Sequence, residues 1–270
     1  MKIAIQGVRG SYHHQVAHRL YGEVGLLECN SFDQLSLAVA NGDVDKGVMA
    51  LGNSIAGSIL NNYALIRKDS LHITAEYYLA IKHQLMALKG QKLEDILEVH
   101  SHPMALLQCK SYFRDYPEIK LVETDDTAAS ALRISRDNKR GVAAIASSKA
   151  AQIYDLEIIA TDIQEVENNV TRFVVVERNQ QNTEHANKAT INFVSSHEAG
   201  ALARILTIIS AQRINLSKIL SIPIIEKPFL YSFVADLEFD DLDQWSAAKQ
   251  QIQPYIMELN VLGLYKRATL

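Results

Sequence analysis

Small polar residues follow several short apolar runs in the first two thirds of the sequence, where strands are expected to end. The clearest pair is Asn53 and Ser54, and similar turns hold Ser11, Ser101 and Thr127. In open α/β sheets such turns meet at the carboxyl ends of the strands, where backbone N–H groups, hydroxyls and amides can hold an anion. Each turn alone is as well explained by a helix cap, so only their number indicates a ligand site.

Thr171 and Arg172 open another apolar run. A threonine hydroxyl can donate and accept a hydrogen bond, and an arginine guanidinium can grip a carboxylate with two parallel hydrogen bonds. The pattern leaves two roles for Arg172 equally open. It is either a clamp for a substrate carboxylate or a salt-bridge partner at the rim of the strand.

Histidines are the other side chains suited to proton transfer or metal binding. His100 and His102 flank Ser101, but no carboxylate or cysteine follows at a metal-ligand spacing. We therefore expect surface or capping histidines there and no metal site. His13 and His14 are expected on a solvated helix face.

The composition is that of an ordinary globular protein. Of the 270 residues, 48% are hydrophobic and 21% are charged. The formal net charge is −4, so the chain lacks the excess of basic residues that is typical of a nucleic-acid-binding protein. Cys29 and Cys109 have no disulfide or metal spacing and are expected to be buried or half-buried free thiols. The sequence enters a strand-like run directly and has no apolar stretch of membrane-spanning length, so we expect a cytoplasmic protein without a membrane partner.

The elements that must position these residues alternate between strands and helices. Strand-like runs at 2–7, 45–51 and 170–178 and helix-like segments such as 54–66 predict an α/β fold with mainly parallel sheets. Residues 179–188 are polar and aperiodic, which indicates a linker. A βαββαβ pattern follows, typical of a ferredoxin-like unit. We therefore predict two domains, 1–180 and 189–270, with a boundary near 180–188.

Several stretches together resemble prephenate dehydratase. They are GVRGSY, LGNSIAGS, HSHPMALLQC, DDTAASA, AAIASSKAAQIYDL and NNVTRF, in the family's order and covering nearly all of residues 1–178. HEAGALARIL and NLSKILSIPI resemble the ACT regulatory domain that is usually fused to this enzyme. The resemblance implies a two-lobed catalytic domain like that of periplasmic binding proteins, with the active site in the cleft between the lobes.

The family converts prephenate to phenylpyruvate, water and carbon dioxide in phenylalanine biosynthesis, without a cofactor. Hydroxide is a poor leaving group, so the enzyme must donate a proton or a strong hydrogen bond to it. The family's essential threonine falls on Thr171, which we expect to act as that donor, with Asn53 and Ser54 as its catalytic partners.

The resemblance also assigns residues that bind the substrate. Arg172 would orient a substrate carboxylate, and Phe173 would supply an apolar wall that disfavours its charge. The other expected substrate-binding residues are Ser11, Ser101, Gln108 and Thr127.

Three departures from the family pattern stand out. Val8 replaces the usual proline, so the first loop is expected to be less rigid. Gly52 replaces the glutamate of the usual Pro-Ile-Glu-Asn-Ser. The regulatory Glu-Ser-Arg-Pro becomes Leu220 to Pro223, without either charge. Because Thr171 and its amide and hydroxyl neighbours remain, we expect activity.

The ACT resemblance implies phenylalanine as effector and pairing of ACT domains in a dimer or dimer of dimers. Residues 199–203 still resemble one half of the phenylalanine site, which works through backbone groups and small side chains. The expected effector-binding residues are Ala199, Gly200, Ala201, Leu202, Leu220 and Ser221.

Two alternatives stay open. One is an arogenate or cyclohexadienyl dehydratase, whose substrate carries an amino group that would require an extra acceptor. The other is a catalytically degenerate amino-acid sensor, which the departures at Gly52 and Ile222 would favour. Product formation from prephenate or arogenate separates these readings.

Overall fold

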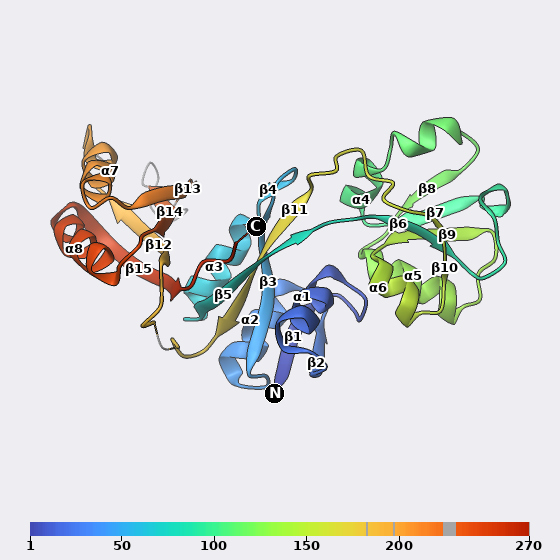
Figure 1. Ribbon diagram of the computed structural model, residues 1–270, viewed down its shortest axis with the longest axis horizontal. Coiled ribbons are helices and arrows are strands. Elements are labelled where there is room, and N and C mark those ends of the chain that lie inside the picture. The colour runs from blue at the N-terminus through green and yellow to red at the C-terminus, as the bar shows by residue number, and fades with distance from the viewer. Residues whose placement is uncertain (182, 197, 224–230, 270) are drawn as a thin grey trace. The chain divides into compact units, whose positions relative to one another are not determined.

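The computed structural model describes residues 1–181, 183–196, 198–223 and 231–269 (Figure 1). The chain divides into two compact units, each built from several segments. Unit 1 comprises residues 1–35, 47–58 and 78–173, and unit 2 comprises 36–46, 59–77 and 174–270. The functional boundary near residues 180–188 stays a prediction.

The first sheet of unit 1 is parallel where the chain begins. Strand β1 (Lys2–Gln6) pairs in parallel with β2 (Gly25–Cys29), and the helix α1 (Tyr12–Tyr21) connects them. On its other side β1 neighbours β3 (Lys46–Asn53), which is followed in the sheet by β11 (Val170–Glu177). This arrangement brings the first residues of β11 beside the end of β3, although more than one hundred residues separate them in sequence.

The second sheet of unit 1 has five strands in the order β10-β6-β9-β7-β8. Strand β7 is parallel to both β8 and β9, whereas β6 is antiparallel to β9 and β10. The sheet is therefore mixed, and the expectation of mainly parallel sheets is wrong here. The strands are β6 (Gln84–Ala87), β7 (Glu98–Ser101), β8 (Lys120–Glu123), β9 (Val142–Ala146) and β10 (Glu157–Ala160).

Apolar side chains cover both faces of this second sheet. One core includes Leu85, Val99 and Ile145, and the other includes Met86 and Ala144, as alternation along a strand requires. The accompanying helices are α4 (Pro103–Gln108), α5 (Thr127–Arg136) and α6 (Ser148–Ile153), with short turns η1 (Leu93–Asp95) and η2 (Tyr112–Asp115). Burial on both faces explains why the central strand β9 is a continuous apolar run, Val142 to Ala146.

Residues after β3 form a hairpin where the sequence predicts a helix over 54–66. The chain turns back at once into β4 (Gly57–Ser58), which pairs antiparallel with β3, and the helix α3 (Leu60–Lys68) begins only after it. Two backbone N–H groups of the turn are bonded by the Asn53 side chain, and Gly57 has φ +82°. This positive φ suits glycine and interrupts a helix, so the small-residue stretch forms a turn.

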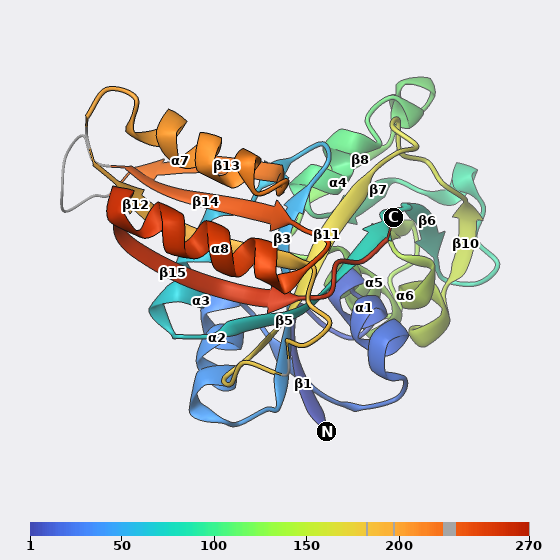
Figure 2. The same ribbon diagram turned by 60° about the vertical axis from the view of Figure 1, so that its left-hand side comes forward.

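Unit 2 contains the βαββαβ segment that the sequence predicts. Its strands lie in the order β13-β14-β12-β15 with antiparallel neighbours, and α7 and α8 cover one face of them (Figure 2). All eight residues of the central strand β12 are buried. The elements are β12 (Lys188–Ser195), α7 (Ala201–Ala211), β13 (Asn215–Pro223), β14 (Tyr231–Glu238), α8 (Leu242–Ile252), η3 (Gln253–Tyr255) and β15 (Ile256–Tyr265).

The remaining elements of the chain are α2 (Phe32–Asn41), which the division of units crosses, and β5 (His72–Ala80). Within unit 2, β15 meets β5 at Gly263 and Ile73. A Cβ atom on Gly263 would lie 2.4 Å from the Ile73 carbonyl oxygen, so only glycine fits this contact.

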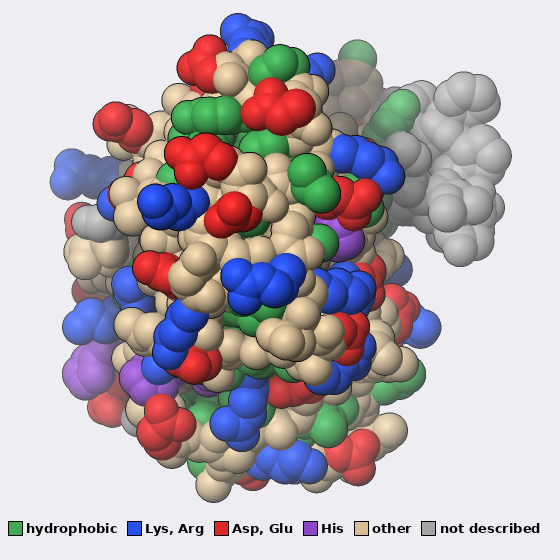
Figure 3. Space-filling model, turned by 90° about the vertical axis from the view of Figure 1, so that its right-hand side faces the viewer, with side chains coloured by type: hydrophobic (Ala, Val, Ile, Leu, Met, Phe, Trp, Pro, Cys, Tyr) green, Lys and Arg blue, Asp and Glu red, His purple; other side chains and the backbone are tan. Residues whose placement is uncertain are grey.

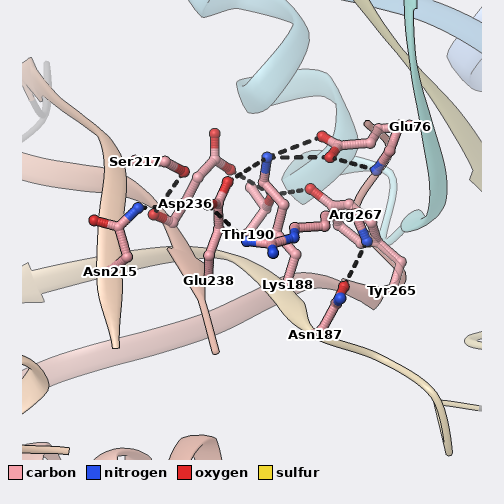
Figure 4. Close-up of polar contacts among 11 residues, drawn as sticks. Glu76, Asn187, Lys188, Thr190, Asn215, Ser217, Asp236, Glu238, Tyr265 and Arg267 are labelled. Atoms are coloured by element: carbon pink, nitrogen blue, oxygen red, sulfur yellow. Dashed lines mark hydrogen bonds and ion pairs between the residues drawn. The ribbon is translucent and has the colours of Figure 1, made fainter. Parts of the chain in front are cut away.

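A polar cluster joins β5 to the βαββαβ segment inside unit 2 (Figure 4). The Lys188 ammonium is 3.1 Å from the Glu76 carboxylate and 3.3 Å from that of Glu238. The Lys188 side chain is 3% exposed and that of Glu76 is fully buried. The Glu76 carboxylate also accepts the backbone N–H of Ala268 at 3.1 Å, so it also holds the last strand's C-terminal extension.

Candidate active site

The side-chain amide of Asn53 is oriented by the hairpin at the end of β3. Its Oδ1 accepts the backbone N–H groups of Ile55 and Ala56, both at 2.9 Å. A backbone N–H can only donate, so the oxygen must face the turn and the NH₂ group must face away from it. The local turn thereby fixes which end of Asn53 is presented to the rest of unit 1.

The Asn53 NH₂ group donates to two side chains at the start of β11. Nδ2 lies 2.9 Å from Thr171 Oγ1 and 2.5 Å from Asn169 Oδ1. Thr171 is 8% exposed. Because its oxygen accepts from Asn53, the Thr171 hydroxyl keeps its own proton for another acceptor. The structure thus brings together Thr171 and Asn53, two of the predicted catalytic residues.

Gln108, at the end of α4, belongs to the same cluster. Its Oε1 accepts Asn169 Nδ2 at 2.8 Å and lies 2.9 Å from His83 Nε2. His83 in turn lies 2.9 Å from the Tyr12 hydroxyl through Nδ1. The cluster therefore runs without a break from Thr171 to Tyr12, at the start of α1.

Three members of this cluster were missed by sequence reasoning: Tyr12, His83 and Asn169. Asn169 lies inside the NNVTRF motif, two positions before Thr171, so the motif itself could have indicated that the two side chains share a site. His83 and Tyr12 carry no spacing that relates them to each other or to Thr171. Only the fold brings them to Gln108.

The members of the cluster are uncharged around neutral pH. Burial lowers the pKa of His83, although its hydrogen bond to Gln108 opposes that shift. Burial also raises the pKa of the Tyr12 hydroxyl, and electrostatic interaction with the Cys109 thiol and the carboxyl groups of Asp126 and Asp162 adds to that effect. The site therefore works with neutral hydrogen-bond donors and acceptors.

On the face of the molecule drawn in Figure 3, Lys and Arg side chains are interspersed with Asp and Glu side chains, so no large patch carries a single sign of charge.

Ser54 lies next to Asn53 but makes contacts of a different kind. Its hydroxyl accepts the backbone N–H of Val170 at 3.0 Å and donates to the Asn168 carbonyl at 3.2 Å. Its own N–H donates to the Val170 carbonyl at 2.9 Å. Ser54 thus fastens the hairpin to the strand that carries Thr171, and its catalytic role stays a prediction.

Of the hydroxyl residues expected to bind substrate, two lie at helix starts and one at the end of a strand. Ser11 is the N-cap of α1 and accepts the His14 N–H, and Thr127 is the first residue of α5, after the N-cap Asp126. Ser101 is fully buried and donates to the Ile145 carbonyl at 2.6 Å, which binds β7 to β9.

The helix after Ser101 is capped by the next residue. His102 Nδ1 accepts the Met104 N–H at the start of α4, which agrees with the expected capping histidine. The expectation that Ser101 itself starts this helix is wrong, because its hydroxyl is used by the sheet. His100, in β7, lies 2.9 Å from the Glu98 carboxylate.

Arg172 and Phe173 follow Thr171 in β11, and both are buried. Side chains alternate along a strand, so Arg172 points to the face of β11 opposite Thr171. Phe173 is 2% exposed and its ring meets the His13 ring edge to face at 5.0 Å between centroids. Their contacts to substrate stay predictions.

His13 and His14 are buried, and their expected place on a solvated helix face is wrong. The His13 ring packs between Phe32 and Phe173, and burial lowers its pKa to about 3. His14 Nδ1 accepts the Gly10 N–H at 2.9 Å. Both free cysteines are buried as expected, and burial raises the pKa of the Cys109 thiol to about 12.

Unit 2 carries a separate pocket at the start of α7, with a volume of about 630 Å³. It is lined by four of the six residues expected to bind an effector, Ala199 to Leu202, together with Phe233 and others. Leu220 and Ser221 are not among its described lining residues, although Ser221 lies opposite Phe233 in the β13–β14 register.

Within the described ranges, no group of three or more His, Cys, Asp or Glu side chains is placed to hold a metal ion. Among the same residues, no helix combines the length and the apolar character needed to cross a membrane.

Comparisons with known proteins agree on one family. A prephenate dehydratase family model matches residues 3–181. An Arabidopsis thaliana protein described as arogenate dehydratase/prephenate dehydratase 2, chloroplastic, is 36% identical over 98% of this chain and 72% of its own length. A prephenate dehydratase from Arthrobacter aurescens in complex with L-Phe matches with a TM-score of 0.89 and 25% identity, over 99% of this chain and 90% of its own.

A second solved structure is similar in fold alone. It is described as GqqA, a novel type of quorum quenching acylase, and it matches with a TM-score of 0.90 and 24% identity over 99% of this chain and 98% of its own. The matches to prephenate dehydratase structures confirm the expected α/β fold with a catalytic domain like that of periplasmic binding proteins.

Proposed function

Since the chain belongs to the prephenate dehydratase family, we propose that it converts prephenate to phenylpyruvate, water and carbon dioxide. One observation carries the assignment of the donor. Asn53 Nδ2 donates to Thr171 Oγ1 at 2.9 Å, and Asn53 is itself held by the two backbone N–H groups of its turn. The Thr171 proton is therefore free to bond the leaving hydroxyl of the substrate.

The reaction needs little more than this donor. The electron pair of the bond to the ring carboxylate moves into the ring as carbon dioxide departs. The ring's carbon–oxygen bond breaks, and the departing oxygen, hydrogen-bonded by Thr171, takes up one proton that solvent supplies and leaves as water, so that Thr171 keeps its own proton overall. Aromatisation supplies much of the driving force, so a hydrogen bond that strengthens as the oxygen becomes negative suffices in place of a strong acid.

The cooperative hydrogen bond from Asn53 makes Thr171 a better donor. An oxygen that accepts a hydrogen bond is polarised, which strengthens the bond that its own O–H group makes. Gly52 offers no carboxylate beside it, and this mechanism does not require one. That these residues line a cleft between two lobes stays a prediction from the family resemblance.

Substituting Thr171 tests the proposal. Thr171→Ala removes the donor and is expected to lower kcat with prephenate by about 10²- to 10⁴-fold, because a positioned proton donor contributes that much. Thr171→Ser keeps the hydroxyl and is expected to stay within about tenfold of the parent protein. The measurement is phenylpyruvate formation by absorbance, with thermal melting to show that both variants are folded.

The parent protein must itself turn over prephenate or arogenate. A folded parent protein without either activity would contradict the proposal and favour a degenerate amino-acid sensor. Arogenate is the second candidate substrate, because the Arabidopsis relative is described by both activities. The ratio of kcat/KM for the two substrates decides which one the protein prefers.

We also propose that the βαββαβ segment is an ACT regulatory domain that binds phenylalanine. The pocket at the start of α7 supports this, as does the Arthrobacter relative described in complex with L-Phe. Both charges of the family's Glu-Ser-Arg-Pro motif are absent from this chain. Whether bound phenylalanine inhibits turnover is therefore decided by measuring activity with and without phenylalanine. Self-association through this domain and a cytoplasmic location remain predictions from the sequence.

A further inference from the structure

The hydrogen bonds around Gln108 can be read in only one direction. The turn forces Asn53 Oδ1 to accept, so Nδ2 must donate to Asn169 at 2.5 Å, and the atom it meets must be the oxygen Oδ1. Asn169 then has only its NH₂ group to offer to Gln108, 2.8 Å away. Gln108 must therefore present Oε1 to it. No amide in this series can be flipped without setting two donors or two acceptors against each other.

The same direction determines the protonation of His83. Gln108 Oε1 is an acceptor, so the His83 nitrogen 2.9 Å from it, Nε2, must carry a proton. In the neutral ring Nδ1 is then a lone pair, and the Tyr12 hydroxyl, 2.9 Å from it, shares its single proton between Nδ1 and the Lys82 carbonyl oxygen, 3.0 Å away. The backbone N–H of His83 donates to Gln164 at 2.8 Å, which fixes the position of the residue.

These contacts occupy one end of the Gln108 side chain. Oε1 receives two donors, one from Asn169 and one from His83. A carbonyl oxygen has two lone pairs, so this acceptor is filled. The end of Gln108 that remains to meet another molecule is its NH₂ group, a donor suited to a carboxylate or hydroxyl oxygen.

We propose that His83, held by Tyr12, is a positioning residue that locks Gln108 with its NH₂ group presented to the substrate. The inference rests on the proposed dehydratase function for its kinetic consequence. His83 does not touch the reacting atoms in this scheme. It acts through Gln108, and nothing in the sequence relates the two residues.

The groups around His83 support a neutral ring. Burial lowers its pKa, and the phenol of Tyr12 is the titratable group that it contacts directly. The neighbouring Lys82 and Asp162 form an ion pair with each other at 2.8 Å. Burial therefore favours the neutral ring, and the Gln108 oxygen favours its Nε2–H tautomer.

A double-mutant cycle tests the proposal. His83→Phe keeps a ring but removes the donor, and we expect kcat/KM for prephenate to fall by about 10-fold, mostly through KM, as loss of one hydrogen-bond restraint implies. Gln108→Leu is expected to lower it by at least as much. In the Gln108→Leu background, His83→Phe should have little further effect, because the residues act in series. Additive losses would overturn the proposal.

Two further variants keep the test independent of folding defects. His83→Gln restores an N–H group near the position of Nε2 and should recover most of the loss, whereas a residue that only fills space would not be rescued by it. Tyr12→Phe removes a single hydroxyl and should give a smaller loss of the same kind. Thermal melting identifies any variant that fails to fold.

An activity-independent measurement separates this proposal from the proposed function. Nitrogen chemical shifts of the free, labelled protein should show His83 neutral and protonated at Nε2 near neutral pH. A ring protonated at Nδ1 would overturn the proposal even if the protein is a dehydratase. A parent protein without turnover would instead refute the dehydratase function, and with it the kinetic part of this proposal.

Discussion

At the scale of single residues, the backbone of one turn sets the chemistry of the candidate site. Asn53 is oriented by Ile55 and Ala56, and it passes that orientation to Thr171. The Thr171 substitutions described above test the hydrogen bond from Asn53 to Thr171. The His83 variants test the other hydrogen bonds of the cluster, which run from Asn53 through Asn169 and Gln108 to His83. Gly52, where the family has glutamate, lies beside Ser58 in the β3–β4 pair, so the hairpin forms without a carboxylate.

His13 provides a residue-scale prediction for acid stability. The folded state holds its pKa at about 3, against 6.5 for an ordinary histidine, because the buried ring cannot be hydrated when charged. As pH falls below about 6.5, the unfolded chain takes up a proton that the folded state refuses. The free energy of unfolding should therefore fall by up to about 1.4 kcal/mol per pH unit until the folded pKa is reached.

Urea unfolding between pH 7 and pH 4 measures this effect. His13→Phe removes the titrating group and keeps an aromatic ring between Phe32 and Phe173, so its stability should depend less steeply on pH. His18, on the same helix but 39% exposed in its side chain, supplies a matched control as His18→Gln. Equal pH dependence in the His13 variant and the parent protein would contradict the prediction.

At the scale of elements, the buried ion pair of Lys188 and Glu76 connects β12 to β5 within unit 2 (Figure 4). Two charges buried together are compensated, whereas one alone is not. Thr190 follows Lys188 on the same face of β12. Its hydroxyl donates to the Asp236 carboxylate at 2.6 Å, which extends the polar contacts to β14. The strands are thus joined by side chains as well as by backbone hydrogen bonds.

Removing one partner of that pair should be more harmful than removing both. Lys188→Met leaves the Glu76 carboxylate buried without its cation, and we expect unit 2 to lose about 3 kcal/mol of unfolding free energy. Glu76→Met combined with Lys188→Met should recover much of the loss. The single tryptophan, Trp245, is buried in α8 and reports the transition by fluorescence. Equal stability of the single and double variants would contradict this expectation.

At the scale of the whole molecule, the candidate active site and the candidate effector pocket lie in different parts of the chain. The Thr171 cluster lies in unit 1, and the pocket at the start of α7 lies in unit 2. If phenylalanine binds in that pocket and lowers the affinity for substrate, the free energy of coupling between the two sites is reciprocal, so substrate binding must weaken phenylalanine binding by the same factor.

A bulkier side chain in the pocket at the start of α7 should weaken phenylalanine binding without changing turnover of prephenate. Ala199→Leu is expected to weaken phenylalanine binding by about tenfold, or about 1.4 kcal/mol, because the larger side chain takes up pocket volume that the ligand would fill. Turnover of prephenate without phenylalanine should be unchanged. Ala211→Leu makes the same change at the exposed last residue of α7, outside the pocket lining, and should leave binding unaltered. Calorimetry that shows equal affinity in both variants would place the effector elsewhere.

The sequence by itself determined the elements and the identity of the principal site residues. Alternating apolar runs predicted most strands and helices of both units, and the family motifs named Asn53, Gln108 and Thr171, which the structure joins through Asn169. Their residue types are local facts, because hydroxyls and amides can only donate and accept in certain ways. The hairpin at 53–58 was missed because small residues fit a turn and a helix start equally well.

Only the tertiary structure decided the partners of those residues. His13 shares a helix face with Val16 and Ala17, but its burial depends on Phe32 and Phe173, which come from other segments. His83 and Tyr12 are 71 residues apart, and their contact requires α1 and the start of β6 to meet. Periodicity reports which face of an element is buried, and it is silent on what that face meets. The direction of the hydrogen bonds from Asn53 to His83 is therefore a property of the folded chain.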